Sequence, residues 1–210
     1  VVDIRTGSIV YTCNLPLRNI PLRKLFKRRL GLHLYVENDA NCAALAEYYA
    51  GAGQGSKRFV AITLGTGIGA GIIHNGKIFH GGNGMAAQAL QDNPDSILAQ
   101  VIREHDGHVS GQSAFMAARL GDPVGRQVCD MYIGYLAAGI ANVVNIFQPD
   151  TLAIGGGVSN EADEQLLHPL QRLVEQETIP CSSDKKTRIV KAQLGNQAGI
   201  IGAALLGKKK

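Results

Sequence analysis

The sequence predicts an α/β fold, because short apolar strands alternate with helices along most of its 210 residues. Three of these strands end in clusters of glycine. The 26 glycines gather at such points and therefore mark tight turns of the backbone rather than a diffuse linker. With 45% hydrophobic and 18% charged residues, the chain has the composition and the length to bury a core.

The first fifty residues predict strands and short helices in turn. In order, they are two extended segments in VVDIRTGSIVYTCNLP joined at Thr6-Gly7, the helix PLRKLFKRRLG with Pro21 at its first position and Gly31 at its end, the buried strand LHLYV, and an alanine-rich helix from Asn41 to Tyr49 that ends at Gly51.

The rest of the chain continues this alternation. Three short strands are expected next: the first ends at Leu64, the second runs from Gly71 to His74, and the third runs from Lys77 to Phe79. The Asn-Gly of HNGK forms the hairpin turn between the last two. The stretch SGQSAFMAARLGD predicts a helix capped by Ser110 or Ser113. A long helix follows, with apolar residues at helical spacing: Val124, Val128, Met131, Leu136, Ile140, Val143 and Phe147. The last elements are the strand TLAIGGG, a helix from Ala162 to Gln176, the strand TRIVKAQL and the helix QAGIIGAALLG.

Composition excludes several classes of function. The net charge of +4 is small and scattered, so we expect no nucleic-acid partner. The cysteines Cys13, Cys42, Cys129 and Cys181 form no CxxC pair, which favours free thiols in a reducing cytoplasm. The longest apolar stretch, YLAAGIANVVNIF, is too short to span a bilayer, and no signal peptide is visible.

The first glycine cluster, LGTGIGAG, predicts a phosphate-binding turn. Glycines at alternate positions let backbone N–H groups converge, and Thr66 adds a hydroxyl donor. A tight β-hairpin would explain the same residues. The clusters AIGGGVS and LGNQAG follow two further strands, and ligands of parallel sheets gather at such carboxyl ends. Together the three clusters favour a nucleotide site.

The stretch VENDAN places Glu37, Asn38, Asp39 and Asn41 at a strand-to-helix junction. Asp39 could simply cap the helix, but a cap needs one side chain and not four. The alternative is that Asp39 acts as a general base for a hydroxyl that attacks a phosphoryl group, with Asn38 orienting that hydroxyl. The histidines give weaker evidence of a functional site. EHDGH is typical of an exposed loop, and His80 either packs at a strand end or touches substrate.

The segments NLPLRNIPL, VENDANCAALAE, LGTGIGAGIIHNGKIFHGGNG, NIFQPDTLAIGGGVS and LGNQAGIIGAAL, in this order, resemble the ROK family of repressors and sugar kinases. The resemblance covers nearly the whole chain. It implies a two-lobe, ribonuclease H-like fold with a cleft, of the actin, Hsp70 and sugar kinase superfamily. Residues 1–38 would be the remnant of an N-terminal lobe and residues 39–210 the C-terminal lobe.

The resemblance also implies a function: phosphorylation of a hexose, glucose first, by ATP with Mg²⁺. Asp39 would be the catalytic base. Glu37, Asn38 and Asn83 would contact the sugar. The ATP contacts would be Gly65, Thr66, Gly67, Gly155, Gly156, Gly157 and Asn196. The family further implies a homodimer in the cytoplasm with no membrane partner. A sugar-responsive transcriptional repressor, which would bind DNA, and an N-acetylmannosamine kinase remain alternatives.

Two departures from the family pattern matter. The Asp-x-Gly-Gly-Thr phosphate loop of the N-terminal lobe is absent, and the family's zinc segment is missing at a join near Ala87-Gln88. No metal ligands are therefore expected within the 210 residues. We expect the intact protein to contain both segments, including a structural zinc.

Overall fold

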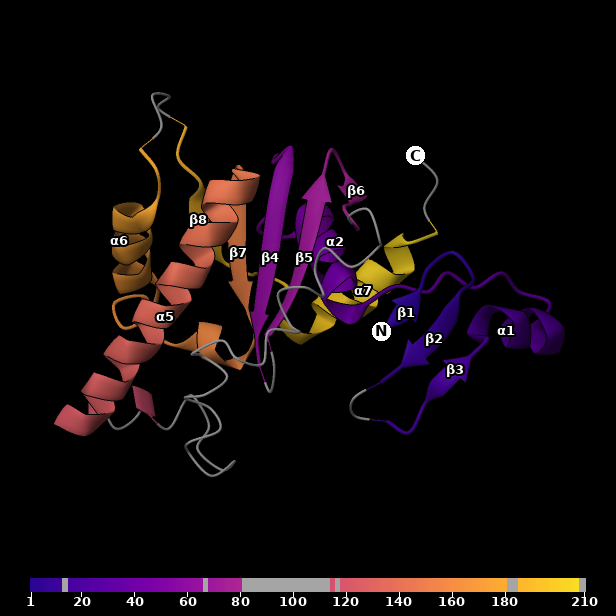
Figure 1. Cartoon of the computed structure of the whole chain (residues 1–210), viewed down its shortest axis with the longest axis horizontal. Coiled ribbons are helices and arrows are strands. Elements are labelled where there is room, and N and C mark those ends of the chain that lie inside the picture. Colours follow the sequence, from indigo (N-terminus) through magenta and orange to yellow (C-terminus); the bar gives the residue numbers. More distant parts are fainter. Residues whose placement is uncertain (13–14, 66–67, 81–113, 116–117, 181–184, 208–210) are drawn as a thin grey trace.

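A computed structural model of the chain describes residues 1–12, 15–65, 68–80, 114–115, 118–180 and 185–207. Its centre is a mixed five-stranded sheet in the order β6-β5-β4-β7-β8 (Figure 1). The strands are β4 (Arg58–Leu64), β5 (Ile68–His74), β6 (Lys77–Ile78), β7 (Thr151–Gly155) and β8 (Arg188–Lys191). β4, β7 and β8 are parallel, whereas β5 and β6 are antiparallel to their neighbours. The carboxyl ends of β4, β7 and β8 therefore lie side by side at one end of the sheet, its carboxyl edge.

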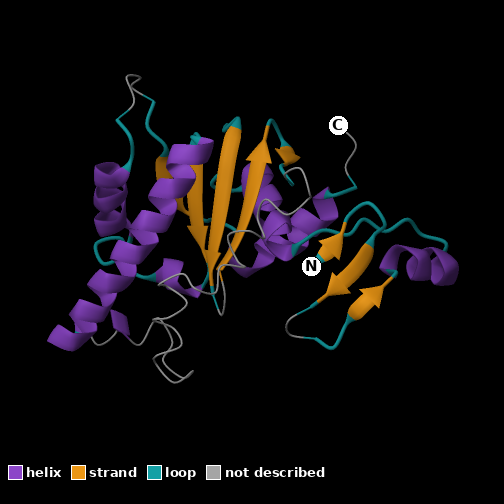
Figure 2. Ribbon diagram, in the orientation of Figure 1, coloured by secondary structure: helices purple, strands orange, loops and turns teal. Residues whose placement is uncertain are grey.

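Helices cover both faces of this sheet (Figure 2). α5 (Pro123–Phe147) and α6 (Leu167–Glu177) lie on one face, and α2 (Asp39–Ala50) and α7 (Ala198–Leu205) lie on the other. The alternation of strand side chains divides the core accordingly. In β4, Val60, Ile62 and Leu64 pack toward α5 and α6, while Phe59 and Ala61 pack toward α2 and α7.

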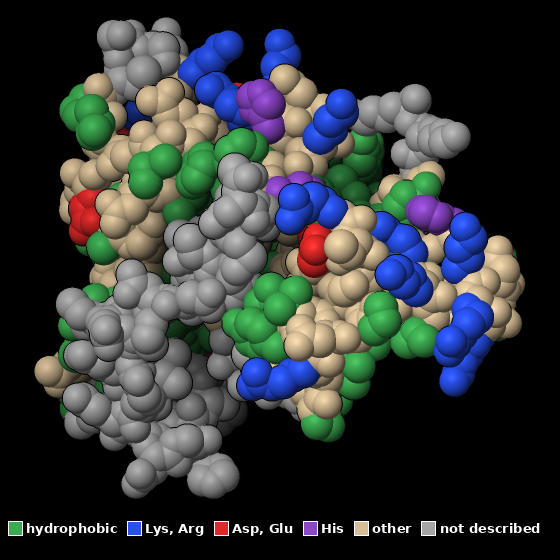
Figure 3. Space-filling model, turned by 45° about the vertical axis from the view of Figure 1, so that its right-hand side comes forward, with side chains coloured by type: hydrophobic (Ala, Val, Ile, Leu, Met, Phe, Trp, Pro, Cys, Tyr) green, Lys and Arg blue, Asp and Glu red, His purple; other side chains and the backbone are tan. Residues whose placement is uncertain are grey.

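The N-terminal residues form a second, three-stranded antiparallel sheet in the order β1-β2-β3. Its strands are β1 (Val2–Asp3), β2 (Ser8–Tyr11) and β3 (Arg18–Ile20), followed by α1 (Leu22–Leu30). Figure 3 shows that Lys and Arg side chains are frequent on this side of the molecule. The turn at Thr6-Gly7 is as predicted, with Gly7 at a φ of 68°. β3 was not predicted.

Three predictions about this N-terminal part and the long helix are wrong. The segment LHLYV is not a strand, and Leu32 and Tyr35 are 60% and 48% exposed, because no partner strand lies beside it among the described residues. Pro21 precedes α1 as its N-cap residue and is not its first helical residue. Met131 of α5 is exposed; Cys129 and Ile133 face the core instead.

The other elements match their predictions to within a few residues, apart from the helix expected at Ala162, which begins at Leu167, and β5, which begins three residues early. Asn75 and Gly76 form the predicted hairpin turn with positive φ angles of 48° and 75°. Ser110 and Ser113, the expected N-caps, lie outside the described residues, as does the join near 87–88. The division of the chain at residues 38 and 39 stays a prediction.

α5 is long and apolar enough to cross a membrane when judged by length and composition alone, over Gly125–Phe147. A helix that belongs to a protein core passes the same test. Leu136, Ile140 and Val143 of α5 are buried against the sheet, so core packing explains these apolar residues of the helix.

Two glycines let α2 lie unusually close to its neighbours. A Cβ atom at Gly71 of β5 would be 2.7 Å from the carbonyl oxygen of Ala40 and 2.5 Å from the Cβ atom of Ala44. A Cβ atom at Gly202 of α7 would be only 1.7 Å from the carbonyl oxygen of Cys42. α2 is therefore held between β5 and α7 at distances that only glycine permits.

We predict that Gly202→Ala lowers the free energy of unfolding by about 2 kcal/mol, because α7 must move away from α2 to make room for the methyl group. Gly199→Ala is the matched control in the same helix, since no atom lies within 4 Å of the position of its Cβ. Alanine there should be neutral or slightly stabilising. Urea denaturation of both variants measures the difference, and equal effects would contradict the close packing of α2 on α7.

Candidate active site

The polar stretch that opens α2 forms the amino end of that helix. Asn38 is its N-cap residue, with extended backbone (φ −69°, ψ 145°), and its Oδ1 accepts hydrogen bonds from the N–H groups of Ala40 and Asn41 at 3.0 and 3.3 Å. The cap is thus supplied by Asn38 and not by Asp39, the residue expected to cap in the simpler interpretation. Because Oδ1 is engaged in the cap, the group of Asn38 that can bind a ligand is Nδ2, which donates hydrogen bonds.

Asp39 is the first residue of α2, and its side chain is exposed. Its Oδ1 accepts from the N–H group of Ala40 at 2.9 Å. Asp39 is therefore an accessible carboxylate, fixed to the backbone by one oxygen.

Glu37 is held by three hydrogen bonds. Its Oε1 accepts from the backbone N–H of Asn38 and from Nδ2 of Asn41, both at 2.9 Å, and its Oε2 lies 2.6 Å from Nε2 of His80. The Glu37 side chain is 6% exposed. Both oxygens are thus engaged within the protein, and their contacts orient the Asn38–Asn41 turn. The sugar contact predicted for Glu37 stays a prediction.

The direction of α2 aims this turn at the carboxyl edge of the sheet. Near its start, Ala40 lies against Gly71 in the middle of β5, and near its end the hydroxyl of Tyr49 donates to the carbonyl oxygen of Gly76 in the turn after β5. α2 therefore runs in the direction of β5. Its amino end, with Asp39, faces the edge where β5 begins and where β4 and β7 end.

Two of the predicted nucleotide loops meet at that edge. Gly156 follows β7 with a φ of 93°, and a Cβ atom on it would be 2.1 Å from the carbonyl oxygen of Leu64, at the end of β4. Gly65 comes next in the chain, and none of the described residues other than its chain neighbours lies within 4 Å of the position of its Cβ. The backbone of Gly156 thus packs directly on the segment that leads into LGTG. Thr66, Gly67 and Asn83 lie outside the described residues.

The segment after Gly156 is fixed by charged side chains that the sequence did not single out. Ser159 of the short 3-10 helix η2 (Gly157–Asn160) donates from Oγ to the carbonyl oxygen of Gly156 at 2.7 Å. Glu161, 6% exposed, pairs with Arg119, and its carbonyl oxygen accepts from Lys191. Lys191 also pairs with Asp163 at 2.6 Å and holds the pKa of that carboxyl below its usual value. These contacts limit the conformations of the second glycine cluster.

The third cluster is tied to α2 by a buried carboxylate. Oε1 of Glu47 accepts from the N–H groups of Gln193 and Leu194 at 2.9 and 2.7 Å, and Oε2 accepts from that of Ala52 at 2.8 Å. Glu47 is 1% exposed. Asn196, in the 3-10 helix η3 (Gly195–Gln197), follows this anchor and is exposed. An acidic residue among the alanines of AALAEYYA was the available sequence signal, and it was missed.

We expect Glu47→Gln to lower the free energy of unfolding by about 2 kcal/mol, because an amide NH₂ must then face a backbone N–H donor in a buried site. The exposed Glu177 offers the control Glu177→Gln, which should change stability little. Denaturant unfolding measures both. A small effect of Glu47→Gln would mean that the three hydrogen bonds contribute little to the anchor.

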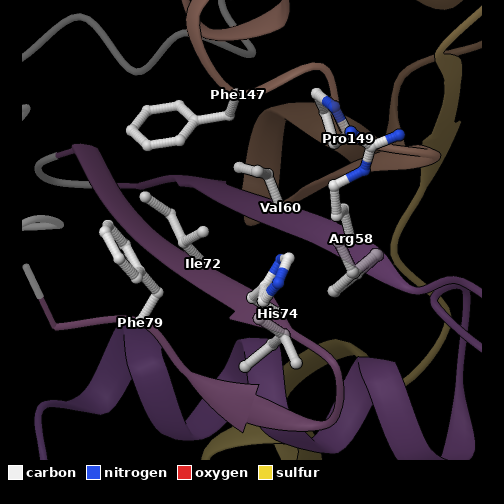
Figure 4. A pocket seen from close by; sticks show the side chains of 9 residues that line it. Arg58, Val60, Ile72, His74, Phe79, Phe147 and Pro149 are labelled. Atoms are coloured by element: carbon white, nitrogen blue, oxygen red, sulfur yellow. The ribbon is translucent and has the colours of Figure 1, made fainter.

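A cavity of about 190 Å³ lies elsewhere (Figure 4). Its labelled lining residues are Arg58, Val60, Ile72, His74, Phe79, Phe147 and Pro149. It is located where β4 begins and β5 ends, at the opposite end of the sheet from Gly65. The cavity therefore does not belong to the candidate active site, which is formed by loops.

The thiol of Cys42 is buried beside the polar turn. Burial, and then the charges of Glu37 and Asp39, raise its pKa to about 12 from an ordinary value of 9.0. The thiol is consequently protonated and unreactive at neutral pH. Cys42 and Cys129 are both free and buried, as the sequence predicts for free thiols. Cys13 and Cys181 lie outside the described residues.

The raised pKa of Cys42 predicts a loss of stability at high pH. The folded protein keeps a proton that the unfolded chain releases above about pH 9, so the free energy of unfolding must fall as pH rises from there toward 12. Cys42→Ala should show a shallower decline than the wild type. Urea unfolding at several pH values between about 8 and 11 compares the two slopes, and parallel curves would contradict the burial of this thiol.

Comparison with known proteins identifies related chains. The profile of the ROK family matches residues 1–89 and 95–210. A glucokinase from Halalkalibacterium halodurans is 33% identical over 246 residues, and the match covers 100% of this chain and 74% of the relative.

Two solved structures share the fold. A ROK family glucokinase from Streptomyces griseus, in complex with glucose and AMPPNP, has a TM-score of 0.77 at 32% identity, covering 98% of this chain and 78% of that one. A ROK family transcriptional regulator, described as a homologue of the E. coli MLC protein, has a TM-score of 0.76 at 25% identity, covering 98% and 59%. The likeness confirms the fold class predicted from the sequence.

Proposed function

The chain belongs to the ROK family, and from that premise we propose that it transfers the γ-phosphoryl group of ATP to a hydroxyl of a hexose. The observation that carries the proposal is the exposed Asp39 at the amino end of α2, which faces the sheet edge where Gly65 and Gly156 meet. A base and a backbone cradle for phosphate at one edge are the minimal set for phosphoryl transfer.

In this reaction the sugar hydroxyl oxygen attacks the γ-phosphorus. Its proton passes to the carboxylate of Asp39, the bond between the γ-phosphorus and the bridging oxygen breaks, and ADP leaves. Because Oδ1 of Asn38 is occupied by the helix cap, we propose that Asn38 orients the hydroxyl only by donating from Nδ2. The role expected for Asn38 from the sequence, to orient the hydroxyl, is thereby limited to donating a hydrogen bond.

The backbone near Gly65, Gly155, Gly156 and Gly157 fits the nucleotide. Gly65 has open space where a side chain would be, so a phosphate could approach its N–H group closely. Asn196 is exposed on the neighbouring junction. Among the described residues, no group of three or more His, Cys, Asp or Glu side chains could hold a metal ion. Magnesium, which neutralises phosphate charge in such reactions, would be bound largely by the phosphates of ATP.

Glucose is our first proposal for the sugar, because the 33% identical relative and the structure at 32% identity are both glucokinases. An N-acetylmannosamine kinase remains the nearest alternative. The sugar-pocket residues expected to separate these two sugars fall largely in the family segment that is missing near Ala87-Gln88. We propose a cytoplasmic homodimer in which the intact protein carries a structural zinc.

A transcriptional repressor is the second candidate, supported by the likeness to the ROK regulator. A sugar-binding repressor needs the sugar contacts but has no use for a general base. The accessible carboxylate of Asp39 therefore favours the kinase. Sugar-dependent binding to DNA without turnover would reverse this preference.

We predict that Asp39→Asn lowers kcat for hexose-dependent ADP release at least about 100-fold, since asparagine cannot accept the proton. The substitution keeps the size of the side chain, and KM for ATP should change little. Asp130→Asn, at an exposed position of α5, is the matched control and should retain full activity. A coupled ADP assay of the intact protein across a hexose panel measures these values. Turnover undiminished by Asp39→Asn would exclude Asp39 as the base.

A further inference from the structure

Resting on the kinase function proposed above, we infer that His80 is a positioning residue that acts through Glu37 on the turn carrying Asp39. Nε2 of His80 lies 2.6 Å from Oε2 of Glu37. Because an ionised carboxylate only accepts hydrogen bonds, Nε2 must carry the proton and donate it. The sequence allowed two roles for His80, packing at a strand end or contact with substrate, and the positioning role differs from both.

The geometry makes His80 the long-range anchor of the turn. The other two donors to Glu37, the N–H of Asn38 and Nδ2 of Asn41, lie within four residues of it and move with it. His80 is 43 residues away in the sequence and follows β6, which is an outermost strand of the five-stranded sheet. Its bond thus ties the Glu37 carboxylate to the sheet by a side-chain contact, in addition to the backbone packing of Ala40 and Asn41 on Gly71.

Burial makes this contact sensitive to change. The Glu37 side chain is 6% exposed and that of His80 is 24% exposed. Charge-assisted hydrogen bonds of this length are among the stronger ones, especially when they are shielded from water. Without His80, Oε2 would turn toward solvent, and Oε1 would release the backbone of Asn38 and the amide of Asn41. Asp39, the next residue after Asn38, would lose its fixed position.

The expected effect falls on catalysis more than on binding. A displacement of the base by a fraction of an ångström reduces the rate of proton transfer while the sugar can still bind through other contacts. His80→Phe, which keeps the ring and removes the donor, should lower kcat about tenfold and raise KM for the hexose much less. His80→Gln, which returns an N–H donor at similar reach, should restore kcat to within about twofold of the wild type.

The test measures kcat and KM of the intact protein for the wild type, His80→Phe, His80→Gln and the control His74→Phe. His74 is exposed at the end of β5, and its imidazole bonds only to Asn75 among the described residues, so loss of the ring should leave kcat unchanged. Hydrogen exchange of the peptide over residues 36–42 is the second readout. Faster exchange in His80→Phe, restored in His80→Gln, is the expected result.

The possible failures are distinguishable. If the wild type turns over a hexose but His80→Phe has an unchanged kcat, or if His80→Gln does not restore it, the positioning role is overturned and the kinase function stands. If stability falls in His80→Phe while kcat per folded molecule is unchanged, the residue is only structural. If the wild type turns over no hexose, the proposed function fails, and the positioning role fails with it.

Discussion

The buried carboxylate of Glu47 is the interaction on which the arrangement of the candidate site depends. It joins α2 to the segment before α7 through the N–H groups of Gln193 and Leu194, residues about 146 positions away. A buried carboxylate is stable only when its oxygens accept hydrogen bonds, so this anchor must be complete for the helix to dock. Gly51, the residue that follows α2, has no room for a side chain, because a Cβ atom would be 2.1 Å from Oε2 of Glu47.

Glycines and the anchor together determine where the amino end of α2 lies. Glu47 fixes one half of the helix, while Gly71 and Gly202 allow contact with β5 and α7 along the other half. One cost of this close packing is visible: Oδ1 of Asn41 is buried without a hydrogen-bond partner among the described residues. An unsatisfied buried acceptor costs about 1–3 kcal/mol, and such costs are typical of sites kept for function rather than stability.

Sequence reasoning was reliable where the determinant is local. The Asn75-Gly76 hairpin, the helix that begins beside Asp39 and the glycine turn after β7 all follow from residues within a few positions of one another. It failed for LHLYV, because an apolar stretch becomes a strand only if another strand pairs with it. The links from Glu37 to His80 and from Gly156 to Leu64 could not be predicted, because they join distant segments whose proximity only the fold creates.

The four polar side chains that open α2 have different local roles, and only one of them is left without a role in holding the turn together. Asn38 caps the helix, Glu37 is engaged by three hydrogen bonds, and Asn41 is buried with its amide donated to Glu37. Of the four, Asp39 alone is exposed, and within the described part of the chain its carboxylate bonds only to the next backbone N–H. Helix stability does not require a carboxylate there once Asn38 supplies the cap. An accessible carboxylate that the helix does not need for its cap fits the general-base role proposed for Asp39.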